Sequence, residues 1–255
     1  MVHTEAALWS LSLIGLENPS SAPSCTVGIL QPSYLPWLGF FDQLHRVDIF
    51  VHYDDVQFEK GSWRNRNRIK TPAGPLWLTV PVHIKGQNFP LIRDVRINRA
   101  ERWGKKHVKS IEQNYRKAPY FEAYGPDLFA VIERGHEFVL DLNLELLSLL
   151  AAWLGITTPT VLASELGIAG NKSERLLGIL TSLGATVFYE GASGRNYIDE
   201  AIFVHQGIKL IYQEYVHPIY TQLHGEFMPY LSIIDLVFNH GPASLEILLQ
   251  GGKAF

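Results

Sequence analysis

The spacing of hydrophobic positions changes several times along the chain, and each change predicts a different element. Residues 27–68 open with a short apolar run that ends in a Gln-Pro pair, continue with an amphipathic segment, and reach a second apolar run before polar residues take over. Short apolar runs bounded by turn residues are typical of buried strands, and the amphipathic segment between them indicates a helix. The predicted order is strand, loop, helix, strand and polar loop.

The pattern becomes helical between residues 100 and 155. Trp103, His107, Ile111 and Tyr115 recur at every fourth position, which places them on one face of a helix. Two further helical segments follow, and Gly155 is placed to cap the second one. Before them, residues 75–84 predict a third strand, with residues 93–97 as a segment that pairs nearby. We expect residues 100–155 to form a helical insert or layer.

An alternation of strand and helix returns near residue 158. A β-branched run, a helix with Asn171 as its N-cap and a strand that ends in a Gly/Ser turn span about thirty residues, which is the signature of a βαβ unit. A long strand interrupted at His217-Pro218 and a helix ended by Gly241 follow. The whole pattern predicts an α/β fold with a mostly parallel, Rossmann-like sheet (of the nucleotidyltransferase or HUP type) flanked by helices.

The composition is that of a globular protein. The chain has 255 residues, of which 47% are hydrophobic and 18% are charged, so it can bury a substantial core. A net charge of -3 gives no reason to expect a nucleic-acid partner. The single cysteine, Cys25, excludes an internal disulfide and is expected to be an inert thiol.

Residues 1–24 read as a flexible extension, and residues 25–255 as a single domain. The first 24 residues lack a basic start and a cleavage site, and their Pro/Ser-rich end is typical of a linker. No apolar run in the sequence reaches the ~18 residues of a membrane span. We therefore expect a cytoplasmic protein.

Polar side chains follow the first two predicted strands. Gln31 and Tyr34 come after the first strand, and Asp54, Asp55 and Gln57 come after the second. In an open parallel sheet, ligands bind at the edge where the strands end. We expect these residues to contribute to a site there. One of the two carboxylates is a candidate general base, and the alternative is that each holds a backbone or arginine partner.

Arginine and asparagine alternate after these carboxylates. In an extended segment, Arg64, Arg66 and Arg68 lie on one side, with Asn65 on the other and Trp63 before them. Guanidinium groups bind phosphate and carboxylate, so the row fits a diphosphate or a phosphopantetheine. The alternative is that the arginines pair with Asp54, Asp55 or Glu59 and hold the loop.

Further candidates lie in the second half of the chain. His217 is a candidate for acid–base work because imidazole titrates near neutrality, although a single histidine on a strand is also compatible with packing. The other candidate substrate-binding residues are Tyr189, Ser193, Tyr197, Gln222, Asp235 and Asn239. Metal-ligand motifs are absent from the sequence, and so are the Gly-x-Ser-x-Gly and Walker motifs, which disfavours serine hydrolase and P-loop chemistry.

Several ordered motifs resemble the WbqC-like proteins over roughly residues 26–243. They are QPSYLPWLGFFDQL, DIFVHYDDVQFEKGSWRNRNRIK, LTVPV, YEGASGRNYID, and HPIYTQ with LSIIDLVFNHGP. The resemblance implies a role in bacterial surface-polysaccharide or specialised-metabolite biosynthesis, with transfer of an acyl or aminoacyl group to an amine. We expect a thioester donor, such as a phosphopantetheine on an acyl or peptidyl carrier protein, and an amine acceptor such as a nucleotide-linked amino sugar.

The opening unit is also similar in layout to pantothenate synthetase. That family has a His-x-Gly-His motif where this chain has Trp37-Leu38-Gly39-Phe40. The glycine remains where it would let a nucleotide approach, but both histidines are absent, which disfavours adenylylation by that route. Two alternatives to the transferase remain open. One is a nucleotide-dependent ligase or nucleotidyltransferase on a degenerate fold, and the other is a non-catalytic protein that binds a glycan precursor or carrier protein.

Overall fold

The computed structural model of the chain describes residues 24–84, 86 and 89–253. All of the expected flexible extension except Ser24 lies outside the described residues. At the centre is a five-stranded sheet in the order β7-β2-β1-β8-β9, and each neighbouring pair is parallel. Its strands are β1 (Thr26–Leu30), β2 (Ile49–His52), β7 (Thr160–Leu162), β8 (Val187–Glu190) and β9 (Lys209–Tyr212). The prediction of a mostly parallel α/β sheet is confirmed.

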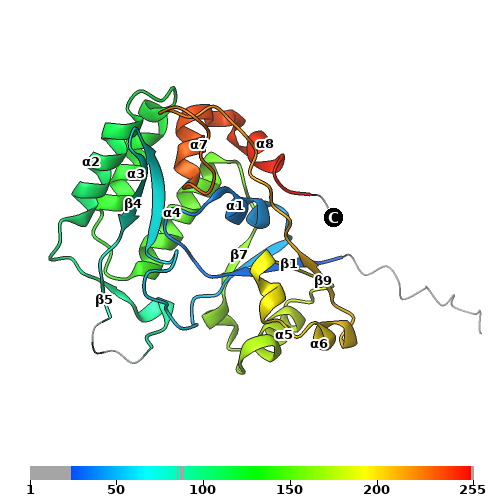
Figure 1. Cartoon of the computed structure of the whole chain (residues 1–255). Helices are drawn as coiled ribbons and strands as arrows, with labels where there is room; N and C mark the ends of the chain where they lie inside the picture. Colours follow the sequence, from blue (N-terminus) through cyan, green and yellow to red (C-terminus); the bar gives the residue numbers. More distant parts are fainter. Residues whose placement is uncertain (1–23, 85, 87–88, 254–255) are drawn as a thin grey trace, which may run out of the picture.

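Both faces of this sheet are covered, which explains why its strands are short apolar runs. On one face, Val27 and Ile29 of β1 pack with α5 (Lys172–Ser182) and α6 (Glu200–His205). On the other face, Phe50 of β2 packs with α1 (Leu38–His45). Figure 1 shows α5 and α6 below the sheet and α1 above it. The core is therefore divided into two layers by the sheet.

The chain reverses its direction of travel at β1. Helix α1 carries it from β1 to β2 on one side, and α5 later carries it from β7 past both strands to β8 on the other side. Counted along the chain, the strand order is 3-2-1-4-5, which is the Rossmann order. The carboxyl ends of β1 and β8 therefore form a topological switch point, where open α/β sheets bind ligands.

The connection from β2 to β7 contains a layer of its own. It holds the antiparallel hairpin of β3 (Arg66–Thr71) and β4 (Gly74–Thr79), and the ladder of β5 (Val82–His83) and β6 (Arg96–Ile97). The helices α2 (Trp103–Tyr115), α3 (Phe121–Glu133) and α4 (Val139–Trp153) follow. The face predicted for α2 is confirmed, because all four of its residues are buried. The third strand predicted at residues 75–84 is divided between β4, in the hairpin, and β5, and neither joins the central sheet. The pairing expected for residues 93–97 is confirmed, because β6 pairs with β5.

The C-terminal part packs against α1. It consists of α7 (Ile233–His240) and α8 (Ser244–Leu249), which are separated by a 3-10 turn at Gly241–Ala243. Elsewhere in the described chain, 3-10 turns lie at Ile92–Asp94, Ala163–Leu166 and Ala192–Asn196. Two details differ from expectation. The long strand ends at Tyr212, and the side chain of the next residue, Gln213, donates to the Gly39 carbonyl of α1. Asn171 occupies the N-cap position of α5 but makes no side-chain capping bond.

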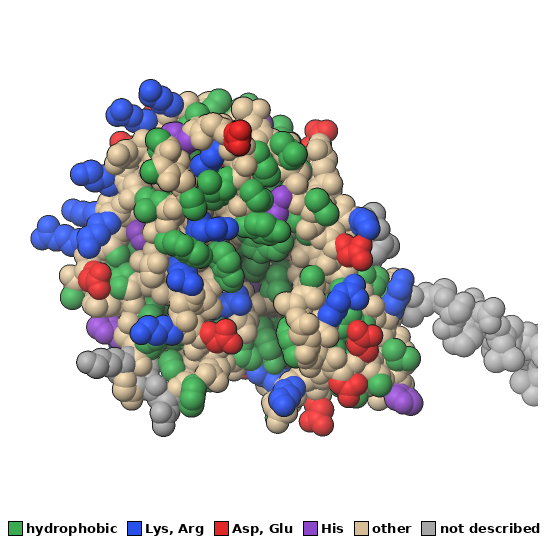
Figure 2. Space-filling view, viewed as in Figure 1, with side chains coloured by type: hydrophobic (Ala, Val, Ile, Leu, Met, Phe, Trp, Pro, Cys, Tyr) green, Lys and Arg blue, Asp and Glu red, His purple; other side chains and the backbone are tan. Residues whose placement is uncertain are grey.

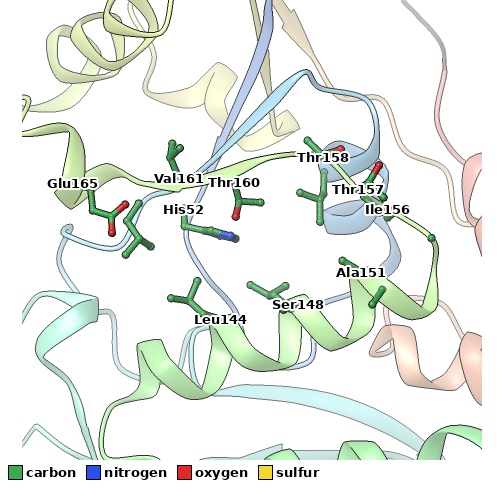
Figure 3. Close-up of a pocket in the computed structure, with 15 residues that line it drawn as sticks. His52, Leu144, Ser148, Ala151, Ile156, Thr157, Thr158, Thr160, Val161 and Glu165 are labelled. Carbon is green, nitrogen blue, oxygen red and sulfur yellow. The ribbon is translucent and has the colours of Figure 1, made fainter.

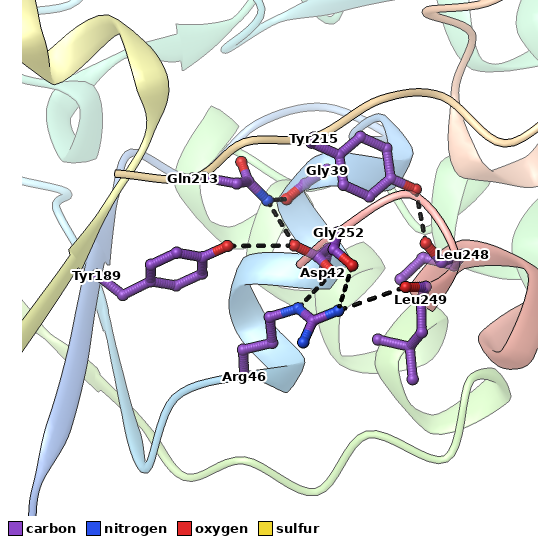
Figure 4. Close-up of polar contacts among 9 residues, drawn as sticks. All are labelled: Gly39, Asp42, Arg46, Tyr189, Gln213, Tyr215, Leu248, Leu249 and Gly252. Carbon is purple, nitrogen blue, oxygen red and sulfur yellow. Dashed lines mark hydrogen bonds and ion pairs between the residues drawn. The ribbon is translucent and has the colours of Figure 1, made fainter. Parts of the chain in front are cut away.

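A buried polar network attaches α1 to the end of the chain (Figure 4). The Asp42 carboxylate is fully buried and accepts hydrogen bonds from Arg46 Nε (2.7 Å), Gln213 Nε2 (2.8 Å) and Tyr189 Oη (3.4 Å). Arg46 also donates to the carbonyls of Leu249 and Gly252. Because a buried carboxylate is stable only when its oxygens have partners, this network fixes α1 beside the switch point.

Candidate functional site

A pocket of about 300 Å³ opens at the switch point. It lies between the N-terminal turn of α1 and the Gly-rich turn that follows β8. The residues that line it are Leu30, Trp37, Gly39, Phe40, Gln43, Gly191, Ala192, Ser193, Gln213 and Tyr215. Gln43 and Gln213 are held in place, since their Nε2 groups donate to the carbonyls of Tyr189 (2.7 Å) and Gly39 (2.8 Å). We call this cavity the switch-point pocket.

Arg64 reaches from the β2–β7 connection to the end of β1. Its guanidinium donates to the Gln31 carbonyl (3.2 Å) and to the Ser33 hydroxyl, while its Nε is buried without a partner. Burial lowers the pKa of Arg64 to about 10 and leaves it charged at neutral pH. A buried cation with an unused donor beside a strand end is suited to an anionic ligand group.

Glu190 ends β8 and is the buried carboxyl group closest in sequence to this pocket's Gly-rich turn. Its side chain is 4% exposed, and Tyr197 Oη donates to it at 3.3 Å. Burial raises its pKa to about 8, whereas the hydrogen bond from Tyr197 acts in the opposite direction. The Tyr197 ring is exposed, so its hydroxyl joins the buried Glu190 to the protein surface.

Aromatic rings form the wall beside α1. His217 lies 4.4 Å from the Tyr230 ring and 5.2 Å from the Trp37 ring, centroid to centroid. Burial lowers the pKa of His217 to about 4, and its Nε2 is buried without a partner. The Trp37 ring also fills the space over Gly39, where a Cβ would meet it at 2.1 Å. The glycine therefore admits the Trp37 indole.

Arg66 and Arg68 stand on the exposed side of β3, next to tryptophans. The Arg66 guanidinium lies 4.4 Å from the Trp77 ring, and Trp63 stacks near the same ring at 5.4 Å. Arg68 donates to the Tyr230 carbonyl at 3.0 Å, which joins this patch to the aromatic wall. Figure 2 shows hydrophobic side chains gathered near the middle of this view, with lysine and arginine side chains beside them. Such a surface suits a ligand with an anionic group and an apolar or ring part.

Asp54 and Asp55 lie toward β7. Asp54 is fully buried and accepts from the Ser164 backbone N–H at 3.0 Å, while Asp55 pairs with Arg175 of α5. One oxygen of each carboxylate thus has a partner, while Asp54 Oδ2 and Asp55 Oδ1 are buried without a hydrogen-bond partner among the described residues. A catalytic role for either one stays a prediction. Gln57 is exposed and bridges to Leu91.

Three of the other candidates are parts of the interior. Tyr34 is fully buried, and its hydroxyl lies 2.9 Å from His107 Nδ1. Tyr189 is buried with its hydroxyl at Asp42, and Asn65 donates to the Val80 carbonyl at 2.8 Å. Side chains buried in this way position the elements around the pocket.

Gln222, Asp235 and Asn239 belong to a separate buried cluster. Asp235 accepts hydrogen bonds from Tyr115 (2.8 Å) and Tyr220 (2.9 Å), and burial raises its pKa. Gln222 accepts from Lys70 Nζ at 3.0 Å, and Asn239 donates to the Asp235 carbonyl at 2.6 Å. The cluster joins β3, α2 and α7, and none of its residues lines the switch-point pocket.

Of the sequence-based candidates, the structure places Ser193 in the lining of the switch-point pocket. Gln31 and Arg64 at the end of β1, and Tyr197 after β8, lie outside that lining. The structure adds Glu190, Gln43 and Gln213, which sequence reasoning missed. Glu190 had a recognisable signal, since it is a carboxylate that ends an apolar run next to a Gly-rich turn. Within the described residues, no group of three or more His, Cys, Asp or Glu side chains is arranged to hold a metal ion. Nor does this part of the chain contain a helix long and apolar enough to cross a membrane.

Fold and pocket together define a Rossmann-like α/β protein with a pocket at its switch point. The model of the WbqC-like protein family matches residues 31–247, and the chain belongs to that family, as its motifs predicted. It is also similar to Rv1507c of Mycobacterium tuberculosis (strain ATCC 25618 / H37Rv), an uncharacterized protein. The two are 38% identical over 224 residues, which cover 87% of this chain and 96% of the relative. No solved structure matches the chain.

Proposed function

We propose that the protein is a transferase that moves a small acyl or aminoacyl group from a phosphopantetheine thioester to an amine. The observation that carries the proposal is Glu190, a buried carboxyl group with a pKa of about 8 at the switch point. An acid–base group works best when its pKa lies near the working pH. Burial gives Glu190 this property, and no ion pair to it is formed within the described residues.

In the proposed step, the amine nitrogen attacks the thioester carbonyl carbon. The C–N bond forms, the C–S bond breaks, and the thiolate leaves. The Glu190 carboxylate takes the proton that the amine loses and returns it to the thiolate, so Glu190 is regenerated. Positioning of the two substrates supplies much of the acceleration, and no covalent enzyme intermediate is needed.

The neighbouring groups have binding roles in this proposal. Arg64 holds a phosphate of the donor or of a nucleotide-linked acceptor, since its Nε is unused. Arg66 and Arg68 contact further phosphate at the mouth, and Trp63 and Tyr197 line the approach. The Trp37 ring over Gly39 leaves less room for a nucleotide there, which favours acyl transfer over nucleotidyl transfer.

The test is direct. The full chain is incubated with a panel of acyl and aminoacyl phosphopantetheine thioesters and amino-sugar nucleotides, and the acceptor mass is measured. Transfer should occur with the intact protein and with Glu246→Gln, an exposed control on α8, and should fall about 10²–10⁴-fold with Glu190→Gln. An unchanged acceptor mass across the panel would count against acyl transfer. Release of pyrophosphate from ATP would favour a ligase or nucleotidyltransferase.

A further inference from the structure

A second pocket, of about 520 Å³, lies on the other side of α1 between α4 and β7 (Figure 3). It is formed by the inward face of α4, the segment between α4 and β7, and the end of β2. It shares no lining residue with the switch-point pocket. Nothing in the proposed transfer reaction uses it.

One buried polar side chain points into this pocket. His52, the last residue of β2, is 5% exposed, and its Nδ1 is buried without a hydrogen-bond partner. Figure 3 shows its ring lying between Ser148 of α4 and Thr160 of β7. The Phe50 ring packs edge-on against it at 5.2 Å and fixes its orientation. Buried polar groups in folded proteins normally have hydrogen-bond partners. An imidazole nitrogen without a partner beside a cavity therefore indicates a place for a ligand or a water molecule.

The surroundings of His52 define the chemistry of the ligand. Leu44, Leu147 and Ile156 supply an aliphatic wall, and the hydroxyls of Ser148 and Thr160 flank the imidazole. Of the described residues that line the pocket, none is a lysine or arginine, and Glu165 stands at one side. Burial lowers the pKa of His52 to about 4 against the opposing effect of Asp54, so the ring is neutral at pH 7. An anion would meet a carboxylate and no cation here.

We infer that this pocket is a second small-molecule site, which takes an uncharged, mainly apolar molecule whose hydroxyl or carbonyl hydrogen-bonds to His52. The apolar body fills the space against α4, and the polar group satisfies the imidazole. An apolar pocket with a few placed polar groups is the usual form of such sites. The site is independent of the switch-point pocket, so it can be tested without an assay of transfer.

The experiment uses the full chain and a matched set of probes: octanamide, octan-1-ol and 3-phenylpropanamide as neutral ligands, with octanoate as the charged counterpart. In every protein, binding is followed by the backbone amide resonances of the pocket-lining residues in ¹H–¹⁵N spectra. In the proteins that keep His52, its imidazole resonances in long-range ¹H–¹⁵N spectra are followed as well. We expect saturable shifts with at least one neutral probe and about tenfold weaker binding of octanoate. His52→Phe, which keeps the packing on Phe50, should weaken binding about tenfold because the hydrogen bond is lost.

Two further variants keep the test sharp. Ala151→Phe should abolish binding by filling the cavity next to α4, and His83→Phe, an exposed control on β5, should leave it unchanged. Melting curves establish that each variant is folded. Absence of saturable His52 shifts with all three neutral probes, or equal binding by His52→Phe, overturns the inference. Equal affinity for octanoate and octanamide overturns the proposed ligand class.

Discussion

Asp42 and Glu190 are both buried carboxyl groups near the same end of the sheet, but their surroundings differ. Asp42 accepts from Arg46, Gln213 and Tyr189, and so has a cation and two neutral donors. Glu190 accepts from the hydroxyl of the exposed Tyr197 and has no ion pair within the described residues. The comparison distinguishes a carboxylate whose partners stabilise the fold from one whose pKa is raised toward neutral pH by burial.

The largest expected effect is on the rate of the proposed transfer reaction. Glu190→Gln should lower the transfer rate about 10²–10⁴-fold, since the proton acceptor is lost, while the melting temperature stays the same or rises. Rates are compared with Glu246→Gln under saturating substrates. A Glu190→Gln protein that is fully active would remove the distinction between the two carboxyl groups.

The converse change should act on stability. Asp42→Asn should lower the free energy of unfolding by about 3 kcal/mol, because it leaves the Arg46 charge without its partner in a largely buried place. Urea denaturation measures this loss, with the exposed Asp127→Asn on α3 as the control. A loss below about 0.5 kcal/mol, the usual range for surface substitutions, would show that the network in Figure 4 is not important for stability.

The pH dependence of stability offers a finer comparison. The folded-state pKa of Glu190 is raised to about 8 from 4.5, so the folded protein holds a proton that the unfolded chain has released. The contribution of Glu190 to the free energy of unfolding should therefore be largest below pH 4.5. It should fall between pH 4.5 and 8, by up to about 1.4 kcal/mol per pH unit. In Glu190→Gln this downward slope should be smaller. Denaturation at several pH values measures it, and identical slopes in both proteins would contradict the raised pKa.

The smallest effect concerns Tyr197. The Tyr197 hydroxyl donates a hydrogen bond that favours the charged form of Glu190, so Tyr197→Phe should raise the Glu190 pKa further. The acidic limb of the pH–rate profile should then move toward higher pH. The stability change should be about 1 kcal/mol or less. Tyr230→Phe, an exposed tyrosine in the aromatic wall, should leave that limb in place. A shift of equal size in both variants would assign the effect to the surface in general.

The sequence alone predicted most elements of the fold. Apolar runs predicted β1, β2 and β8, and the four-residue spacing from Trp103 to Tyr115 predicted α2, because burial of one side of an element leaves a periodic record in the sequence. It also predicted a ligand site at the edge where the strands end, and the switch-point pocket lies at that edge. That the pocket binds a ligand stays a prediction. Motifs in residue order identified the family.

Only the tertiary structure decided which polar residues meet at that edge. Tyr34 and Gln31 are three positions apart, yet Tyr34 is in the core and Gln31 lies under Arg64. Asp54 and Glu190 both lie at strand ends. The difference is that Asp54 accepts a hydrogen bond from the backbone of Ser164, which is 110 positions away in the sequence. Burial and pairing depend on contacts between segments far apart in the chain, and local spacing carries no record of them. The sequence determined the elements and their order, and packing determined which carboxyl group keeps its proton near neutral pH.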